Sequence, residues 1–379
     1  MTIKVVHLIT DLNIGGAEKS LYRLLASMDR QQFDSQVVSM VPAGSVGEQI
    51  RSLGIRVRSL SLQPGRPTIS GLRLLTSWLR IEKPDILQTW LYHADLLGVI
   101  AGRLAGIPNV VWNIRNTNID FSQYRRLSGY VVRTCSWVSG WPRVVISNSQ
   151  AGRDFHVRLG YHARRWAVIP NGIDTQAFRP DSDSAGILRR ELGLPMDTLL
   201  IGHFGRYDPM KNQEGFLIAA GELVRSGSEA HFVMVGEEVS GDNAILREVV
   251  NQQALNGRVH MLGRRHDMPR LASALNLLSS SSLGEGFPNV VAEAMACGVP
   301  CVVTDVGDSA LVVGDTGWTV PPNDPSALVK AWNDFLGLPE SERKSMGVKA
   351  RQRICEHFSL DGMTAAYSRL YRDIIAQSK

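Results

Sequence analysis

Two glutamates stand on either side of a predicted helix start near residues 288–289. Glu285 lies in a glycine-flanked loop after a run of serines, and Glu293 lies about one turn into the helix, with Gly298 just past its end. The N–H groups at a helix N-terminus suit a phosphate. Carboxylates repel phosphate and suit hydroxyl-rich partners such as a sugar and a ribose. Either glutamate alone is more simply a helix-dipole partner or a surface charge.

Two cations follow another predicted strand, at residues 199–204. Arg206 and Lys211 come after Gly205 in the sequence Gly-Arg-Tyr-Asp-Pro-Met-Lys. Glycine lets a ligand approach the backbone closely. An arginine fork and a lysine point charge five residues apart can neutralise a diphosphate. By itself, the segment is more simply a loop with two solvated cations.

A pair of glycines, Gly15 and Gly16, follows the first predicted strand, at residues 4–10, and opens a helix. Their backbone amides could approach an acceptor or a phosphate, although a plain tight turn explains them almost equally well. The segment Asn-Ile-Gly-Gly-Ala-Glu-Lys is neither a Gly-x-Gly-x-x-Gly dinucleotide fingerprint nor a phosphate loop that ends in Gly-Lys-Ser/Thr. A hydride-transfer enzyme is therefore disfavoured.

The elements that must position these residues are short apolar strands with helical patterns between them, which is typical of βαβ units. We predict strands at 4–10, 35–41, 57–62, 85–90, 109–114, 144–149 and 167–170, and then at 199–204, 231–236, 258–262, 275–279, 300–304 and 317–320. The predicted fold class is α/β, with two doubly wound parallel sheets. Ligands of such sheets bind beyond the carboxyl ends of the strands. A boundary falls near residues 170–180, and an amphipathic helix covers 359–376.

Length and composition fit two globular domains, since the chain has 379 residues and 44% hydrophobic content. The cysteines show no paired metal-ligand spacing, and Cys297 and Cys301 lie among apolar residues, as small buried hydrophobes do. We expect a reducing, cytoplasmic environment. The first ten residues are typical of a strand rather than of a signal peptide. No uncharged apolar run reaches the roughly 18–20 residues of a spanning helix, and the best candidate, 96–111, is interrupted by Arg103 and Pro108.

The net charge of +5 hides an asymmetry between the two halves. Residues 1–170 hold 21 Lys and Arg against 10 Asp and Glu, whereas residues 171–379 hold 20 against 26. This difference indicates different partners for the two halves. Residues 124–143 mix arginines with aromatic residues, which suits an anionic membrane face or a lipid-linked pyrophosphate acceptor. A helix packed under a loop, with solvated arginines, is an equally good interpretation. Nucleic acid is disfavoured, because no recognised binding module accompanies the charge.

Together, these segments resemble the large family of retaining glycosyltransferases called group 1, or glycosyltransferase family 4, which have the two-domain GT-B fold. The resemblance covers almost the whole chain, through the Gly-Gly-Ala-Glu loop, Ile146-Ser-Asn-Ser, Val168-Ile-Pro-Asn-Gly-Ile-Asp, Gly205-Arg-x4-Lys-Asn, Glu-x7-Glu, Asp305-Val-Gly-Asp-Ser-Ala and Gly317-Trp-Thr-Val-Pro-Pro-Asn-Asp-Pro. The Glu-x7-Glu block with its Gly-Phe-Pro-Asn filling is highly specific, and the glycine loop alone is not. The resemblance implies a role in bacterial surface-polysaccharide or lipid-linked glycan biosynthesis.

The resemblance also implies an organisation and a reaction. Two Rossmann-like domains would face each other across a cleft, with an acceptor-side domain of residues 1–170 plus 359–379 and a donor-binding domain of residues 171–358. A sugar would move from a UDP- or GDP-sugar to a lipid-linked or polysaccharide acceptor, with retained configuration and without metal or cofactor. Asp181 and Asp183 match the Asp-x-Asp metal motif of the other glycosyltransferase fold, but they follow the domain boundary, and we interpret them as turn and capping residues.

The family pattern assigns the donor chemistry mainly to the second half of the chain. Glu285 would hold sugar hydroxyls as a positioning residue rather than a nucleophile, and Glu293 would hold the ribose. Arg206 and Lys211 would stabilise the departing diphosphate. Further donor contacts would come from the glycine loop and from loop backbone, at Gly15, Gly16, Gly205, Gly286, Phe287, Asn289, Val290 and Arg264.

The acceptor side departs from the family pattern. Many members carry a histidine at the end of the strand that corresponds to 109–114, whereas this chain has Arg115 and then Asn116. His93 lies one strand earlier, although a lone histidine at a helix start is more often structural. His93, Arg115 and Asn116 are therefore the acceptor-side candidates.

Two other functions stay open. A nucleotide-sugar epimerase on the same architecture would convert the donor with no acceptor present. A non-catalytic sugar-nucleotide-binding assembly protein would show neither transfer nor hydrolysis, and the complete set of Arg206, Lys211, Glu285 and Glu293 disfavours it.

Overall fold

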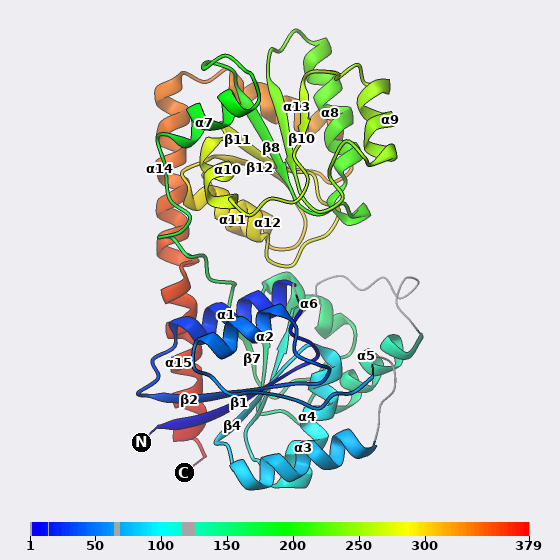
Figure 1. Ribbon diagram of the computed structural model, residues 1–379, viewed down its shortest axis with the longest axis vertical. Helices are drawn as coiled ribbons and strands as arrows, with labels where there is room; N and C mark the ends of the chain where they lie inside the picture. The colour runs from blue at the N-terminus through cyan, green and yellow to red at the C-terminus, as the bar shows by residue number, and fades with distance from the viewer. Residues whose placement is uncertain (1, 14, 64–68, 116–125, 379) are drawn as a thin grey trace. The chain divides into compact units, whose positions relative to one another are not determined.

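The computed structural model describes residues 2–13, 15–63, 69–115 and 126–378 and divides the chain into two compact units (Figure 1). Unit 1 comprises Met1–Gly172 and Leu360–Lys379, and unit 2 comprises Ile173–Ser359. The expected domain boundaries, 170/171 and 358/359, lie next to these divisions. Each unit is a parallel sheet with helices on both faces, and each is described by itself below.

Unit 1 contains seven parallel strands in the order β3-β2-β1-β4-β5-β6-β7. The strands are β1 (Ile3–Ile9), β2 (Phe33–Ser39), β3 (Val57–Ser59), β4 (Ile86–Trp90), β5 (Val110–Ile114), β6 (Val144–Ser147) and β7 (Trp166–Val168). β4 and β5 are buried along their whole length, as central strands covered on both faces are. The chain builds outward from β1 in one direction and then from β4 in the other. The switch point of this sheet, where ligands of doubly wound folds bind, therefore lies between β1 and β4.

Helices cover both faces of the unit 1 sheet. One face carries α1 (Gly16–Ser27), α2 (Ser45–Ser52) and α15 (Leu360–Ala376), whose apolar side chains form one core with the sheet. The other face carries α3 (Ile69–Glu82), α4 (Tyr92–Ala105), α5 (Arg126–Val138) and α6 (Gln150–Arg158) around a second core. The α3, α4 and α5 layer is the outer surface on that side of the unit (Figure 1).

The last helix, α15, belongs to unit 1, although all of unit 2 precedes it in sequence. Its predicted amphipathic face is confirmed, because Met363, Tyr367, Leu370 and Ile374 are all buried. The Asn113 side chain donates a hydrogen bond to the Tyr367 hydroxyl at 2.8 Å. The Tyr371 hydroxyl donates to the Gln88 side chain. Both contacts tie α15 to central strands of the sheet.

Unit 2 contains six parallel strands in the order β10-β9-β8-β11-β12-β13. The strands are β8 (Leu200–Phe204), β9 (His231–Val235), β10 (Val259–Met261), β11 (Leu277–Ser280), β12 (Cys301–Thr304) and β13 (Trp318–Val320). One face carries α7 (Ser184–Glu191), α10 (Met268–Ala274), α11 (Asn289–Ala296), α12 (Ser309–Val313) and α14 (Glu340–His357). The other carries α8 (Gln213–Arg225), α9 (Ala244–Gln252) and α13 (Pro325–Leu336). The switch point lies between β8 and β11.

The predicted α/β class is confirmed, since every predicted strand is present and the strands of both sheets pair in parallel. Cys297 and Cys301 are buried, as predicted, and all four cysteines are free thiols. The apolar run 96–111 is divided between the end of α4 and the start of β5. In the described part of the chain, no helix has the length and apolar character needed to cross a bilayer.

Candidate active site

The switch point of unit 2 brings together two predicted segments that are far apart in sequence. Arg206 and Lys211 follow β8, and Glu285 follows β11, which pairs directly with β8. The helix α11 begins at Asn289, as predicted, so its N-terminus lies four residues beyond Glu285. A cation pair, a carboxylate and a helix N-terminus therefore share one edge of the sheet.

Lys211 and Glu285 form an ion pair at this edge. The Lys211 Nζ lies 2.5 Å from Glu285 Oε1, and the two side chains are 25% and 9% exposed. The Ser282 hydroxyl donates to the same oxygen at 2.7 Å, and Ser282 is itself 1% exposed. Two donors therefore converge on one carboxylate oxygen in a poorly solvated place, where such bonds are stronger than in water. The carboxylate is held in a defined position next to the ammonium.

Arg206 is paired differently. Its side chain is 70% exposed, and its Nε and Nη2 both donate to Asp208 Oδ2, at 3.2 and 2.7 Å. Asp208 Oδ1 accepts the Met210 N–H at 2.9 Å, which caps the short 3-10 helix η1 (Pro209–Lys211). Burial raises the pKa of Asp208, but these hydrogen bonds outweigh it and hold the pKa below its usual value. Asp208 therefore links the exposed guanidinium to the turn that carries Lys211.

The backbone of Lys211 is fixed by buried polar groups that the sequence analysis did not single out. The Ser281 hydroxyl bonds to the carbonyl oxygens of Lys211 at 3.1 Å and Asn212 at 2.8 Å. His203 Nε2 lies 3.2 Å from the same Lys211 oxygen. Burial lowers the pKa of His203 to about 4, so its ring is neutral at pH 7 and Nε2 acts as the donor. The run of four serines at the end of β11 was the available signal for these contacts.

The loop that carries Glu285 rests on Gly307, which follows β12. Gly307 has a φ of +59°, and a Cβ at this position would collide with the Glu285 carbonyl oxygen. The Asp308 N–H donates to the Gly286 carbonyl at 3.0 Å. Gly307 and Asp308 therefore support the Glu285 loop from the neighbouring strand. Both residues belong to the motif Asp305-Val-Gly-Asp-Ser-Ala, to which the sequence alone assigns no role.

The helix α11 places the remaining donor-side candidates in different environments. Glu293 is half-buried and lies one turn into the helix, at the predicted place. Gly286, Asn289 and Val290 are also half-buried. Phe287 is buried, and its ring packs against Phe358 with a centroid distance of 5.6 Å. The side chain of Phe287 is thus part of the core, which agrees with the expectation that only its backbone meets a ligand.

Glycines line the edge of the sheet next to Arg206. The Gly236 N–H after β9 donates to Gly263 after β10 at 2.9 Å, and a Cβ on Gly236 would collide with the Gly205 carbonyl after β8. Three adjacent strands therefore end in closely packed backbone. Arg264, one of the expected donor contacts, is exposed there, with Nη1 4.0 Å from Glu237 Oε1.

In unit 1, Gly15, Gly16 and His93 flank the switch point between β1 and β4. Gly15 is the extended N-cap of α1, and Gly16 is the first residue of that helix. The helix also holds Glu18, whose pKa is raised by burial. His93 lies in the first turn of α4 and is half-buried, and burial lowers its pKa.

Arg115, directly after β5, is held by three neighbours from separate segments. Its guanidinium donates to Asn171 and, at 2.6 Å, to Ser20, and it lies 4.8 Å from the centre of the Trp90 ring. The structure brings Arg115 to the same strand-end region as α1. Asn116, the third acceptor-side candidate, lies outside the described residues.

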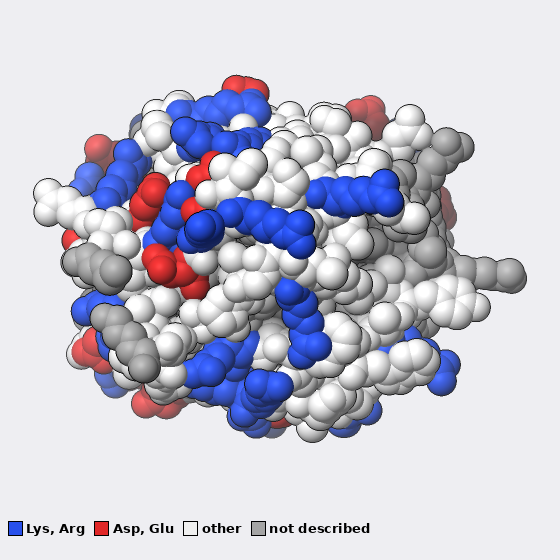
Figure 2. Space-filling view, turned by 90° about the horizontal axis from the view of Figure 1, so that it is seen from below, with Lys and Arg blue, Asp and Glu red and all other residues white. Residues whose placement is uncertain are grey.

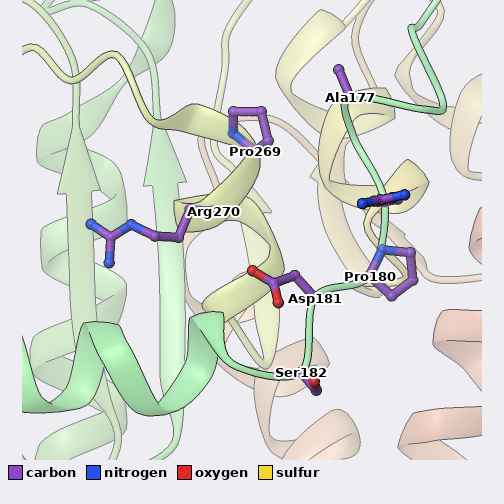
Figure 3. A pocket seen from close by; sticks show the side chains of 7 residues that line it. Ala177, Pro180, Asp181, Ser182, Pro269 and Arg270 are labelled. Carbon is purple, nitrogen blue, oxygen red and sulfur yellow. The ribbon is translucent and has the colours of Figure 1, made fainter.

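Asp181 and Asp183 lie away from the donor-side residues. A pocket of about 520 Å³ beside the start of α10 is lined by Asp181, Ser182 and Arg270, among others (Figure 3). Asp181 accepts bonds from the Asp183 N–H at 3.2 Å and from the Ser184 hydroxyl at 2.5 Å. The predicted turn role is confirmed for Asp181, whereas Asp183 makes no side-chain cap on α7. Within the described ranges, no three His, Cys, Asp or Glu side chains are grouped as metal ligands.

Comparisons with known proteins match both halves of the chain to glycosyltransferases. The family described as "Glycosyltransferase Family 4" matches residues 14–177, and the family described as "Glycosyl transferases group 1" matches residues 198–337. A putative glycosyltransferase, EpsF of Bacillus subtilis, is 29% identical over 80% of this chain and 79% of its own.

Another relative is similar along almost its whole length. It is the Escherichia coli enzyme named UDP-Gal:alpha-D-GlcNAc-diphosphoundecaprenol alpha-1,3-galactosyltransferase, which is 26% identical over 98% of this chain and 97% of its own. Among solved structures, Anabaena Alr3699/HepE in complex with UDP aligns with a TM-score of 0.85 and 22% identity, over 98% of this chain and 100% of that one. A sucrose-phosphate synthase from Thermosynechococcus elongatus aligns with a TM-score of 0.81 and 18% identity, over 99% and 100%. These two structures share the fold.

Proposed function

Because the chain belongs to the group 1 glycosyltransferases of family 4 and has their GT-B fold, we propose that it moves a sugar from a nucleotide-sugar to a lipid-linked or polysaccharide acceptor. The observation that carries this proposal is the meeting of Lys211, Arg206 and Glu285 at the switch point of unit 2. Cations suit a diphosphate there, and a carboxylate suits the hydroxyls of the attached sugar.

The donor is the more strongly supported partner. When the bond to the anomeric carbon breaks, negative charge develops on the nucleotide diphosphate. Lys211, the exposed fork of Arg206 and the N-terminus of α11 would stabilise that charge more in the transition state than in the ground state. The UDP named for the Escherichia coli relative and for the Anabaena structure makes a UDP-sugar the first donor to test.

Glu285 would act as a positioning residue, and the anomeric configuration would be retained. Its Oε1 already accepts bonds from Lys211 and Ser282, which favours holding a hydroxyl over attacking carbon. Glu293, one turn further on, would bind the ribose, and the backbone of Gly205, Gly286, Phe287, Asn289 and Val290 would contact sugar and phosphate. The loop at Arg264 would lie against the base.

We propose that the reaction needs neither metal nor cofactor. Positive charge at the leaving group is supplied by Lys211, Arg206 and the helix N-terminus, so that a metal ion would duplicate their role. The four free thiols support a reducing, cytoplasmic location.

The acceptor would be bound by unit 1, which carries the positive half of the charge asymmetry. Gly15 and Gly16 would border the donor, and His93 and Arg115 would lie on the acceptor side. The name of the Escherichia coli relative contains a diphosphoundecaprenol acceptor, and a lipid diphosphate is a partner that a basic unit would attract.

The proposal is tested in two steps with the full chain. A thermal-shift screen of UDP, GDP and their sugars should show stabilisation by a nucleotide and its sugar, because a ligand bound only by the folded state raises apparent stability. Transfer is then measured for the wild type and for Glu285→Gln, with about a hundredfold or greater loss of turnover expected.

Three results would overturn it. Near-normal turnover in Glu285→Gln would exclude the assigned role of this residue. Conversion of the donor sugar without acceptor would indicate an epimerase. Donor binding with neither transfer nor slow hydrolysis would indicate a non-catalytic binding protein.

A further inference from the structure

The exposed aromatic side chains of unit 1 gather on one short segment. Tyr130, Trp137 and Trp141 are 66%, 68% and 42% exposed. Across the residues that the structure describes, no other Phe, Tyr or Trp side chain in either unit is exposed. Large aromatic groups in water are unusual, and their concentration in one place marks an interaction surface.

These residues lie on one face of α5 and just beyond its end. Tyr130, Arg133 and Trp137 follow the spacing of a single helix face, and all three are exposed. The opposite face is buried, with Val132 and Cys135 in the core of unit 1. The outward face of α5 is therefore a stripe of aromatic, basic and aromatic residues.

The neighbouring helix α4 extends this surface. Arg103, in the last turn of α4, has its guanidinium carbon 3.9 Å from the centre of the Trp141 ring. Leu104, beside it, is 53% exposed. Arg103, Tyr130, Arg133, Trp137 and Trp141 are named here the α5 surface.

The segment that carries this surface is rich in arginine. Residues 121–152 contain four arginines and neither Asp nor Glu, whereas Arg153, directly after them, pairs with Asp154 at 2.8 Å. Figure 2 shows Lys and Arg side chains in several groups on the face that it views, with Asp and Glu side chains beside those on its left. A cationic surface without carboxylates is complementary to a partner with a dense, uniform negative charge.

We propose that the α5 surface docks on an anionic lipid bilayer. Tryptophan and tyrosine have an apolar body and a polar tip, which suits the boundary between lipid headgroups and acyl chains. Arginines beside them would meet lipid phosphates, each contributing to the attraction. The proposal goes beyond the glycosyl transfer proposed above and does not depend on it, because no residue of the α5 surface belongs to the donor site.

The test is flotation of the full chain with vesicles. Vesicles that contain about one third phosphatidylglycerol in phosphatidylcholine are compared with pure phosphatidylcholine, at low and at physiological salt. We expect binding only to the anionic vesicles, and weaker binding at higher salt. Arg133→Glu changes the charge by two units, so the partition coefficient should fall about thirtyfold, at about fivefold for each unit. Trp137→Ala, as a separate variant, should also weaken binding relative to the wild type, because apolar contact with the lipid is lost.

The matched control is Arg247→Glu, at an exposed arginine of α9 in unit 2. It makes the same change of net charge and should bind vesicles almost as the wild type does. Equal loss in Arg133→Glu and Arg247→Glu would overturn the proposal in favour of general charge attraction. Equal binding to neutral vesicles, or no vesicle binding by the wild type, would also overturn it.

A second measurement locates the contact. Lipids brominated near the headgroup should quench tryptophan fluorescence in the wild type, and the quenching should be mostly lost in a Trp137→Phe, Trp141→Phe double variant that still floats with the vesicles. Unchanged quenching in that variant would exclude the α5 surface. Donor hydrolysis in all variants should stay at the wild-type rate, which separates this test from that of the proposed function.

Discussion

Replacing Ser282 with alanine is the sharpest test of how the carboxylate of Glu285 is held. Ser282 is buried at the end of β11, and its hydroxyl donates to Glu285 Oε1 at 2.7 Å. The substitution removes this one donor and leaves Lys211 as the partner of the same oxygen at 2.5 Å. The carboxylate then keeps its charge partner and loses one of the groups that fix its direction.

The size of the effect follows from this geometry. A hydrogen bond to a charged group contributes about 1.5–3 kcal/mol. Where that energy serves to orient Glu285 for transfer, it appears in the activation barrier, and turnover falls about tenfold to one hundredfold. The KM for the donor should change much less, because the cations that hold the diphosphate are untouched.

The assay is steady-state transfer with the wild type, Ser282→Ala and a matched control, Ser279→Ala. Ser279 lies on β11, three residues before Ser282, and is equally buried, but its hydroxyl accepts the Trp332 indole N–H at 3.0 Å and faces the core. We expect Ser279→Ala to lower the free energy of unfolding by about 1–3 kcal/mol and to keep wild-type turnover. The reasoning fails if both variants lose turnover equally, or if Ser282→Ala has a normal kcat.

Three further predictions concern other residues. Burial raises the pKa of Asp95 well above its usual value, so the folded state keeps a proton that the unfolded state loses. The free energy of unfolding should therefore fall as pH rises above about 4, by at most about 1.4 kcal/mol per pH unit. Asp95→Asn should remove this pH dependence in urea titrations between pH 4 and 8. An equal pH dependence in the wild type and in the variant would contradict the prediction. Gly307→Ala should displace the Glu285 loop, because Gly307 has a φ of +59° and a Cβ there would collide with the Glu285 carbonyl oxygen. Calorimetry should then show no stabilisation by the donor, and unchanged donor binding would contradict this prediction. Arg206→Ala should lower kcat about 10²–10³-fold with an unchanged melting temperature, since the side chain is 70% exposed, and a large loss of stability would show that its role is structural.

Much of the fold could be predicted because strand signals in this chain are local. The apolar runs of β8 and β11 are short, rich in Leu and bounded by Gly, Asn or Ser, and this composition is typical of buried parallel strands. Once these strands are placed in a doubly wound sheet, their carboxyl ends must converge. The approach of Lys211 to Glu285, 74 positions apart, therefore follows from topology.

The support of the site could not be predicted in the same way, because it depends on side-chain direction and on single close contacts. Four successive serines indicate a strand end, but only the structure separates Ser282, which bonds Glu285, from Ser279, which bonds Trp332. The three partners of Arg115 are likewise contributed by three separate segments of unit 1. No local pattern carries that information.

The position of α15 sets the order in which the chain can complete its folding during synthesis. Tyr371 is 283 positions from its partner Gln88, and every residue of unit 2 leaves the ribosome between them. At about 5–20 residues per second, the α1 and α2 face of the first sheet stays without its last helix for many seconds while unit 2 is synthesised, and unit 2 has all its residues before α15 emerges. A chain that stopped at residue 359 would retain Lys211, Glu285 and the residues that support them. It would lack α15, so the apolar core of unit 1 on the α1 and α2 face would be exposed to water and to other chains. Unit 1, whose synthesis begins first, is therefore the unit whose fold is completed last.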